Sequence, residues 1–174
     1  MRYADGPTTE ATAVVRAPIE TVWALLTDIS LPARFSTEFT GAEWIDDGPA
    51  LGATFAGRNH HSAIGGWQTT CTVTQYNVHE TFEWSVGEPD HPSAKWRFTC
   101  QTVDDGVQLT QWMQMGPAPS GLTPAIEAMP DKEERIIARR LGEHQLNMQA
   151  NVNGIKQLAE HSANAETHTT TAAD

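Results

Sequence analysis

Positive charge is scarce in this chain of 174 residues. The sequence holds 11 Lys and Arg against 22 Asp and Glu, which gives a formal net charge of -11. A field of this sign repels phosphate backbones and anionic headgroups. The arginines near the C-terminus form no basic cluster either, because Arg135, Arg139 and Arg140 are interleaved with acidic residues, as on a solvated helix face. We therefore expect no nucleic-acid partner.

Long apolar runs are missing as well. No segment approaches the roughly 20 apolar residues that a bilayer-spanning helix needs. Residues 1–7 lack the apolar core of a secretory signal and are expected to be a loose lead-in. The sequence therefore predicts no membrane insertion and a cytoplasmic location.

Cysteine is limited to Cys71 and Cys100, and no CxxC pair exists. Both residues fall on predicted strands with one strand between them, so a spacing of roughly 10 Å keeps them from forming a disulfide. We expect two buried thiols. Motifs for nucleotide loops, serine-hydrolase elbows and zinc proteases are also absent. The sequence predicts no metal site and no cofactor.

The N-terminal region carries the most informative pattern. Residues 8–16 include several β-branched residues, as is typical of a strand, and Pro18 then suits the first position of a helix. Glu20 follows in the first turn, where the helix dipole favours an acid. Residues 30–32 end this helix, and residues 33–35 are predicted as a short second turn. The apolar residues of the first helix recur at helical spacing: Ile19, Val22, Trp23 and Leu26.

Strand signals fill the middle of the chain, and helix signals fill its end. Short turns such as Asp104-Asp105-Gly106 separate the strands, which favours an antiparallel sheet. A short helix is predicted at 123–129 and a long one at 131–160, whereas residues 161–174 lack periodicity and are predicted to be disordered. The further strands are predicted at 37–45, 53–60, 67–77, 81–86, 94–103 and 107–115.

This order of elements resembles the START-like superfamily, the helix-grip fold of the major birch pollen allergen. Within it, the chain is most similar to the bacterial polyketide cyclase/dehydrase-like group, the SRPBCC proteins. The resemblance covers residues 8–160 and rests on the motif Ala-Pro-x-Glu-x-Val-Trp-x-Leu-Leu-x-Asp at 17–28. It implies an α+β fold in one domain: a curved seven-stranded antiparallel sheet around a long C-terminal helix, with two short helices after the first strand.

The resemblance also implies an apolar cavity between the sheet and the C-terminal helix. Its entrance would lie near Phe35 and the loops 87–92 and 116–121. Its lid would be one stripe of the long helix: Ile137, Leu141, His144, Met148, Val152 and Ile155.

Three side chains are candidates for acid/base or anchoring chemistry: Arg58, His60 and His144. Neighbours on a strand face opposite ways, so either His60 or His61 faces the cavity. His144 is a candidate because histidine ordinarily titrates near neutrality, and Asn147 and Asn151 lie beside it on the helix. Glu83 lies between Phe82 and Trp84 and is expected to face solvent if those aromatics face inward.

Other residues are candidates for ligand contact. Trp84 and Trp96 could stack on a flat polycyclic molecule, Trp67 could cover one cavity end, and Gln111 would be a polar group on an apolar face. The complete ligand-binding set is Phe35, Arg58, His60, Trp67, Trp84, Trp96, Phe98, Gln111, Met113, Leu141, His144, Met148 and Asn151.

Three functions remain open at this point. The preferred one is a carrier or sensor that binds a hydrophobic small molecule such as a lipid, polyketide or terpenoid. The second is a cyclase or dehydratase that moves protons with Arg58, His60 or His144. The third is a protein-interaction module, which would require an apolar patch on the outer face of the sheet. The threonines of strand 67–77 make that face polar and argue mildly against this role. A homodimer is possible, although no residue pattern demands one.

Overall fold

A single antiparallel sheet of seven strands forms the body of the protein in the computed structural model, which describes residues 1–170 and their side chains through residue 165. The strand order is β1-β7-β6-β5-β4-β3-β2, so the meander from β2 to β7 is completed by β1 at one edge. The strands are β1 (Thr8–Val15), β2 (Phe39–Trp44), β3 (Thr54–His61), β4 (Gly65–Asn77), β5 (Thr81–Val86), β6 (Ala94–Val103) and β7 (Gly106–Met115).

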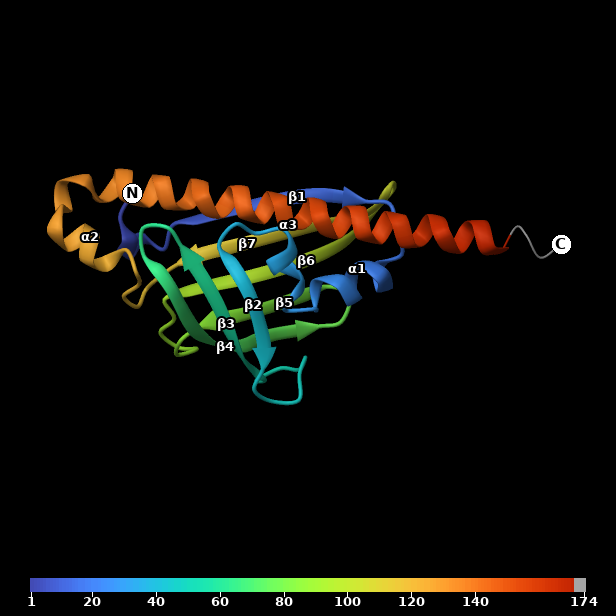
Figure 1. Ribbon diagram of the computed structural model, residues 1–174, viewed down its shortest axis with the longest axis horizontal. Coiled ribbons are helices and arrows are strands. Elements are labelled where there is room, and N and C mark those ends of the chain that lie inside the picture. The colour runs from blue at the N-terminus through green and yellow to red at the C-terminus, as the bar shows by residue number, and fades with distance from the viewer. Residues whose placement is uncertain (171–174) are drawn as a thin grey trace.

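One long helix, α3 (Glu133–Thr170), lies lengthwise against the sheet (Figure 1). Among the strands it packs mainly on β1 and, less extensively, on β7, at the opposite end of the strand order from β2. Between β1 and β2 come α1 (Ile19–Leu26) and a 3-10 turn at Leu31–Arg34. These two short helices, the seven strands and the gripped helix confirm the predicted α+β helix-grip fold.

The helix α3 is longer than the sequence predicts. It continues past the expected end at Glu160 as far as Thr170, so the prediction of disorder is wrong for residues 161–170. A formed helix propagates at little cost, and no Gly or Pro follows Gly154 to stop it. The remainder of the predicted tail, residues 171–174, lies outside the described residues. Before α3, Pro130 interrupts the chain as expected and separates α3 from α2 (Thr123–Ala128).

The N-terminal residues are ordered, contrary to the expected loose lead-in. Residues Tyr3–Asp5 form a 3-10 turn. The Tyr3 hydroxyl lies 2.9 Å from the Ala118 carbonyl oxygen, to which it donates, and the Tyr3 amide donates to Glu133 Oε1 at 2.8 Å. The N-terminus is thereby fixed to the loop after β7 and to the start of α3.

Glu83 lies on the outer face of the sheet, yet it is only 3% exposed. Phe82 and Trp84 face inward as expected, but the prediction that Glu83 faces solvent is wrong. Arg97 on β6 covers the carboxylate and donates to Glu83 Oε2 at 2.7 Å from Nε. Thr74 donates to the other oxygen at 2.9 Å. Flanking side chains therefore bury an outward-facing carboxylate.

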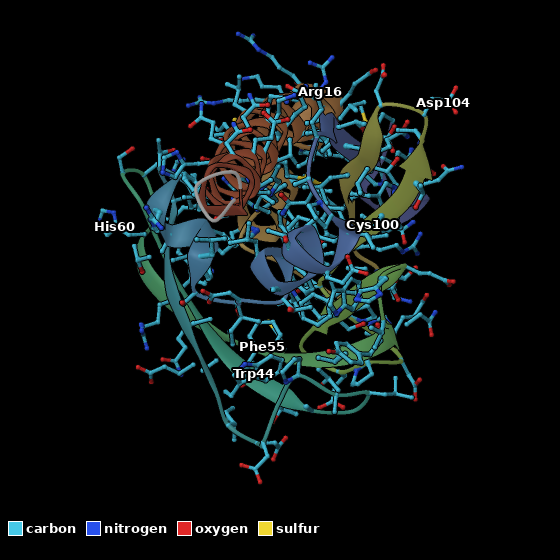
Figure 2. All side chains as sticks on the ribbon, turned by 90° about the vertical axis from the view of Figure 1, so that its right-hand side faces the viewer. Arg16, Trp44, Phe55, His60, Cys100 and Asp104 are labelled. Atoms are coloured by element: carbon cyan, nitrogen blue, oxygen red, sulfur yellow. The ribbon has the colours of Figure 1, made fainter. Side chains whose placement is uncertain are left out.

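The two cysteines behave as predicted. Cys71 lies on β4 and Cys100 on β6, with β5 between them, and both are buried free thiols. Cys100 lies toward the interior in the side-chain view along the sheet (Figure 2). Within residues 1–170, no helix is long and apolar enough to span a membrane.

Candidate functional site: an internal cavity

A cavity of about 520 Å³ lies between the concave face of the sheet and α3. Its size falls within the range of small-molecule sites, about 300–1,000 Å³. Alternation along the strands explains the lining, because every second residue of a strand faces the same side. Aromatic and methionine side chains form a large part of the wall: Phe39, Phe55, Trp67, Phe82, Trp84, Trp96, Phe98, Met113, Met115 and Met148.

Aromatic rings from β3, β5 and β6 contact one another on the concave face. Trp84 lies opposite Trp96 in the β5–β6 register. The ring centroid of Trp84 is 5.3 Å from that of Phe82, 5.9 Å from that of Phe55 and 6.1 Å from that of Phe98. These distances are those of favourable aromatic pairs. The sheet thus presents a continuous aromatic surface to the cavity.

The face that α3 turns to the cavity is more polar than the predicted lid. Ile137, Val152 and Ile155 are buried but do not line the cavity, and Leu141 does not line it either. These apolar residues belong to the core between α3 and the strands on which it packs, chiefly β1. The adjacent face of the helix therefore lines the cavity. The helix residues that line it are Arg140, His144, Asn147, Met148 and Asn151.

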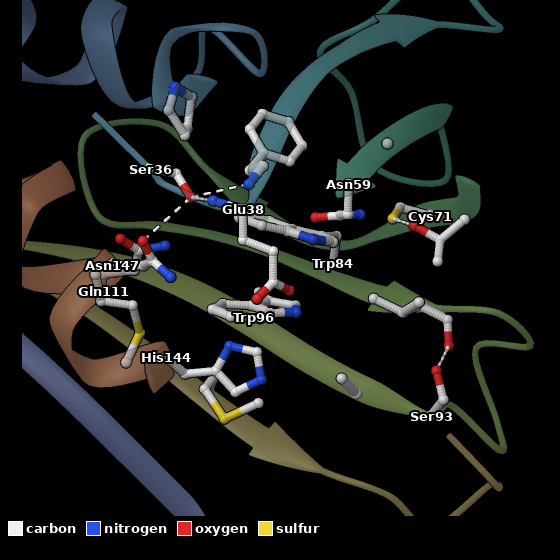
Figure 3. Close-up of a pocket in the computed structure, with 18 of the residues that line it drawn as sticks. Ser36, Glu38, Asn59, Cys71, Trp84, Ser93, Trp96, Gln111, His144 and Asn147 are labelled. Carbon is white, nitrogen blue, oxygen red and sulfur yellow. Dashed lines mark hydrogen bonds between the residues drawn. The ribbon is translucent and has the colours of Figure 1, made fainter. Parts of the chain in front are cut away.

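His144 is held uncharged in this setting. Its ring meets the ring of Trp96 edge-on, with centroids 5.2 Å apart and planes at 86°. Burial, together with the positive charge of Arg140, lowers the pKa of His144 from 6.5 to about 3. The imidazole is therefore neutral at physiological pH and offers one donor and one acceptor nitrogen. Figure 3 shows His144 beside Trp96 in the cavity.

Gln111 and Asn151 form a buried amide pair between β7 and α3. Asn151 Nδ2 donates to Gln111 Oε1 at 2.8 Å. Gln111 therefore has a protein partner. Both side chains line the cavity, and Asn151 Oδ1 is buried with no hydrogen-bond partner in the described part of the chain.

Charged and polar side chains join α3 to the segment before β2. Arg140 donates to both oxygens of Glu38, at 2.6 and 2.5 Å, and to Glu143 at 3.1 Å. Asn147 Oδ1 accepts hydrogen bonds from the amide and hydroxyl of Thr37, at 3.0 and 3.1 Å. The network continues to His61, whose Nε2 lies 3.6 Å from Glu143 Oε2. We call Glu38, Arg140, Glu143 and His61 the clasp.

Four sequence candidates lie away from the cavity: Arg58, His60, Phe35 and Leu141. Arg58 and His60 alternate with Gly57 and Asn59, which do line it, and Arg58 pairs with Glu43 at 3.4 Å. His60 lies near the end of β3 and points outward (Figure 2). The prediction that Arg58 and His60 face the cavity is wrong, because the strand register gives that face to their neighbours.

Phe35 also lies outside the lining and packs instead against Gly154 of α3. The remaining candidates do line the cavity: Trp67, Trp84, Trp96, Phe98, Gln111, Met113, His144, Met148 and Asn151.

Two exposed residues mark where the cavity reaches the surface. Ile64, in the turn between β3 and β4, is 51% exposed, and a Cβ on Gly121 would come within 4.0 Å of it. Both residues line the cavity, as do Tyr3 and Ser93. The loop 116–121 thus contributes to the mouth, as expected, whereas residues 87–92 do not line it.

Three lining residues were not among the sequence candidates: Glu38, Arg140 and Tyr3. Arg140 stands one helical turn before His144, so helical spacing could have found it. Its acidic neighbours made it resemble a solvated position. Glu38 carries no signal in the sequence, because its burial depends on Arg140, which is 102 positions away.

Comparisons with known proteins agree with this architecture. A solved polyketide-cyclase-like protein of Corynebacterium glutamicum is 28% identical, with a TM-score of 0.61 over 88% of this chain and 91% of that chain. The ZhuI aromatase/cyclase of Streptomyces sp. R1128 is 19% identical, with a TM-score of 0.61 over 88% of this chain and 93% of that chain.

The di-domain aromatase/cyclase StfQ of the steffimycin pathway is 13% identical, with a TM-score of 0.68 over 90% of this chain and 51% of that chain. At this identity, and at that of ZhuI, the likeness concerns the fold alone. None of the curated proteins matches. The family described as "Polyketide cyclase / dehydrase and lipid transport" matches residues 7–153, and the chain belongs to this family.

Proposed function

We propose that this protein binds a hydrophobic, ring-containing small molecule in the cavity and acts as its carrier or sensor. The observation that carries the proposal is the cavity of about 520 Å³, walled by touching aromatic rings on β3, β5 and β6. Flat rings stack favourably on such a surface, and Met113, Met115 and Met148 adapt to irregular shapes. The family is associated with cyclases, dehydrases and lipid transport, which supports a ligand of this kind.

A cyclase-type reaction has less support. Of its three candidate groups, only His144 lines the cavity, since Arg58 and His60 face away. A pKa of about 3 makes the His144 imidazole a poor general base near neutral pH, because the best base has a pKa close to the working pH. Binding without turnover is therefore the better-supported function.

Native mass spectrometry tests the proposal directly. The protein, purified from its own host, is expected to carry a small apolar molecule that extraction can identify. Gly57 lines the cavity, and a Cβ there would have only ordinary contacts, so the Gly57→Leu variant is expected to fill the space and lose the ligand. Ala56→Leu is the matched control, because Ala56 neighbours Gly57 on β3 and faces the other side.

The outcomes separate clearly. Ligand retained by wild type and Ala56→Leu but lost from Gly57→Leu supports binding in the cavity. A product that differs chemically from the molecule supplied would favour the enzyme instead. Wild-type protein that is empty, and that shows no thermal shift with lipids, polyketides or terpenoids, contradicts the proposal.

A further inference from the structure

The amide pair of Asn151 and Gln111 has two polar groups that the protein leaves unused. Asn151 is 2% exposed and Gln111 is 6% exposed, and a single hydrogen bond of 2.8 Å joins them. Asn151 Oδ1 accepts no hydrogen bond from residues 1–170. No described residue accepts one from Gln111 Nε2 either, although Gln111 lines the cavity. The pair thus combines one free acceptor and one free donor beside the cavity.

A buried acceptor without a partner is costly, and native proteins satisfy almost all of them. A hydroxyl group can bond to both Asn151 Oδ1 and Gln111 Nε2, because it donates one hydrogen bond and accepts others. A carbonyl oxygen would satisfy only Gln111 Nε2. A carboxylate could accept from Gln111 Nε2 but finds no open cation to balance its charge, since Arg140, the one Arg or Lys among the described lining residues, is already bound by Glu38 and Glu143.

The surroundings indicate what carries the hydroxyl. Gln111 lies opposite Phe98 in the β6–β7 register, and Trp96 lies opposite Met113, so the amide pair borders the aromatic wall. Asn151 Oδ1 is enclosed at present, so a ligand reaches it only if a neighbouring side chain moves. Met113 and Met148 flank the pair along β7 and α3, and methionine side chains move readily.

We propose that Asn151 and Gln111 form a hydroxyl-recognition subsite, and that the preferred ligands are aromatic alcohols or phenols rather than plain ring hydrocarbons. The hydroxyl donates to Asn151 Oδ1 and accepts from Gln111 Nε2, while its ring lies against the aromatic wall. This inference rests on the proposed function, because it names the chemistry of a ligand in the same cavity.

Three probes of nearly equal shape test the subsite by equilibrium dialysis: 2-naphthol, 2-methoxynaphthalene and naphthalene. Wild-type protein is expected to bind 2-naphthol about tenfold more tightly than either other probe, the effect of one or two net hydrogen bonds. The Gln111→Leu/Asn151→Leu double variant removes both partners together, which leaves no unpaired amide. It is expected to bind naphthalene at least as tightly as wild type and to lose the preference for 2-naphthol.

Gln101→Leu is the control, because Gln101 is an exposed amide on β6 that does not line the cavity. It is expected to keep the tenfold preference. Equal affinity of wild type for all three probes overturns the subsite but leaves the proposed function standing. A preference that survives in the double variant also overturns it. If wild type binds none of the probes, the hydroxyl subsite and the cavity's proposed function fail together. The wild-type comparison needs no variant, so poor folding of the double variant does not prevent the test.

Discussion

Glu38 and Arg140 connect two walls of the cavity through a paired hydrogen bond, with distances of 2.6 and 2.5 Å. Glu38 immediately precedes β2, and Arg140 lies on α3, which packs at the other end of the strand order. Both side chains are almost fully buried, with exposed fractions of 11% and 12%. The clasp therefore replaces direct packing of α3 on β2.

Removal of Arg140 should destabilise the fold strongly. In Arg140→Met the Glu38 carboxylate stays buried without its partner, and the free energy of unfolding should fall by about 3–5 kcal/mol in urea titrations. The control is Arg139→Met, because the neighbouring Arg139 side chain is 79% exposed and pairs with Glu143 at the surface. Its effect should stay below about 1 kcal/mol. Equal losses in the two variants would show that the clasp does not hold the walls together.

His144 should make the folded state sensitive to acid. Its pKa is about 3 in the folded protein and about 6.5 in the unfolded chain, so between these two pH values mainly the unfolded chain takes up this proton. The stability contribution is complete above about pH 6.5 and is lost as the pH falls, by about 1.4 kcal/mol per pH unit.

The His144→Phe variant keeps a ring against Trp96 and removes the proton uptake. Chemical denaturation at several pH values between 7 and 4 should therefore show a shallower loss of stability for the variant than for wild type. Parallel profiles for the two proteins would mean that His144 is not buried in its neutral form.

Two glycines of α3 should respond to alanine in opposite ways. A Cβ on Gly154 would lie 2.5 Å from the Phe35 ring, whereas a Cβ on Gly142 would meet no atom within 4 Å. Gly142→Ala should raise the thermal midpoint, because alanine favours a helix by about 1 kcal/mol over glycine. Gly154→Ala should lower it, since Phe35 must move. A rise in both variants would refute the close packing of Phe35 on α3.

The two thiols should be unreactive in the folded protein. Burial raises the pKa of Cys71 and of Cys100 to about 12, so almost none of either thiol is ionised at pH 8. Ellman's reagent should label neither cysteine in buffer and both in guanidinium chloride. Fast labelling without denaturant would show that the sheet opens around one of them.

The strands and the gripped helix could be predicted because their signals are local. Strands Thr81–Val86 and Ala94–Val103 follow from alternation and turn residues, and the structure has the same bounds. The end of α3 could not be predicted in this way, because continuation of a helix through Ser, Ala, Asn and Thr depends on the helix already formed before Glu160.

The site was predictable where strand alternation or helical spacing fixed the inward face, as for Trp84, Trp96 and Gln111. It was not predictable where the sequence does not show which of two alternating sets of residues faces inward. For this reason the predicted orientation of Arg58 and His60 is wrong. Burial of Glu38 and Glu83 depends on Arg140 and Arg97, which lie on other elements. A sequence read element by element does not reveal such long-range pairs.

Methionine methyl NMR tests most directly whether a ligand occupies the cavity. The chain has five methionines: Met113, Met115 and Met148 line the cavity, whereas Met1 and Met129 are exposed. With methyl-labelled protein and 2-naphthol, binding in the cavity should give intermolecular nuclear Overhauser effects to Met113 and Met148 and none to Met1 or Met129. Effects confined to Met1 and Met129, or a spectrum that does not change at a saturating concentration of 2-naphthol, would contradict binding in the cavity.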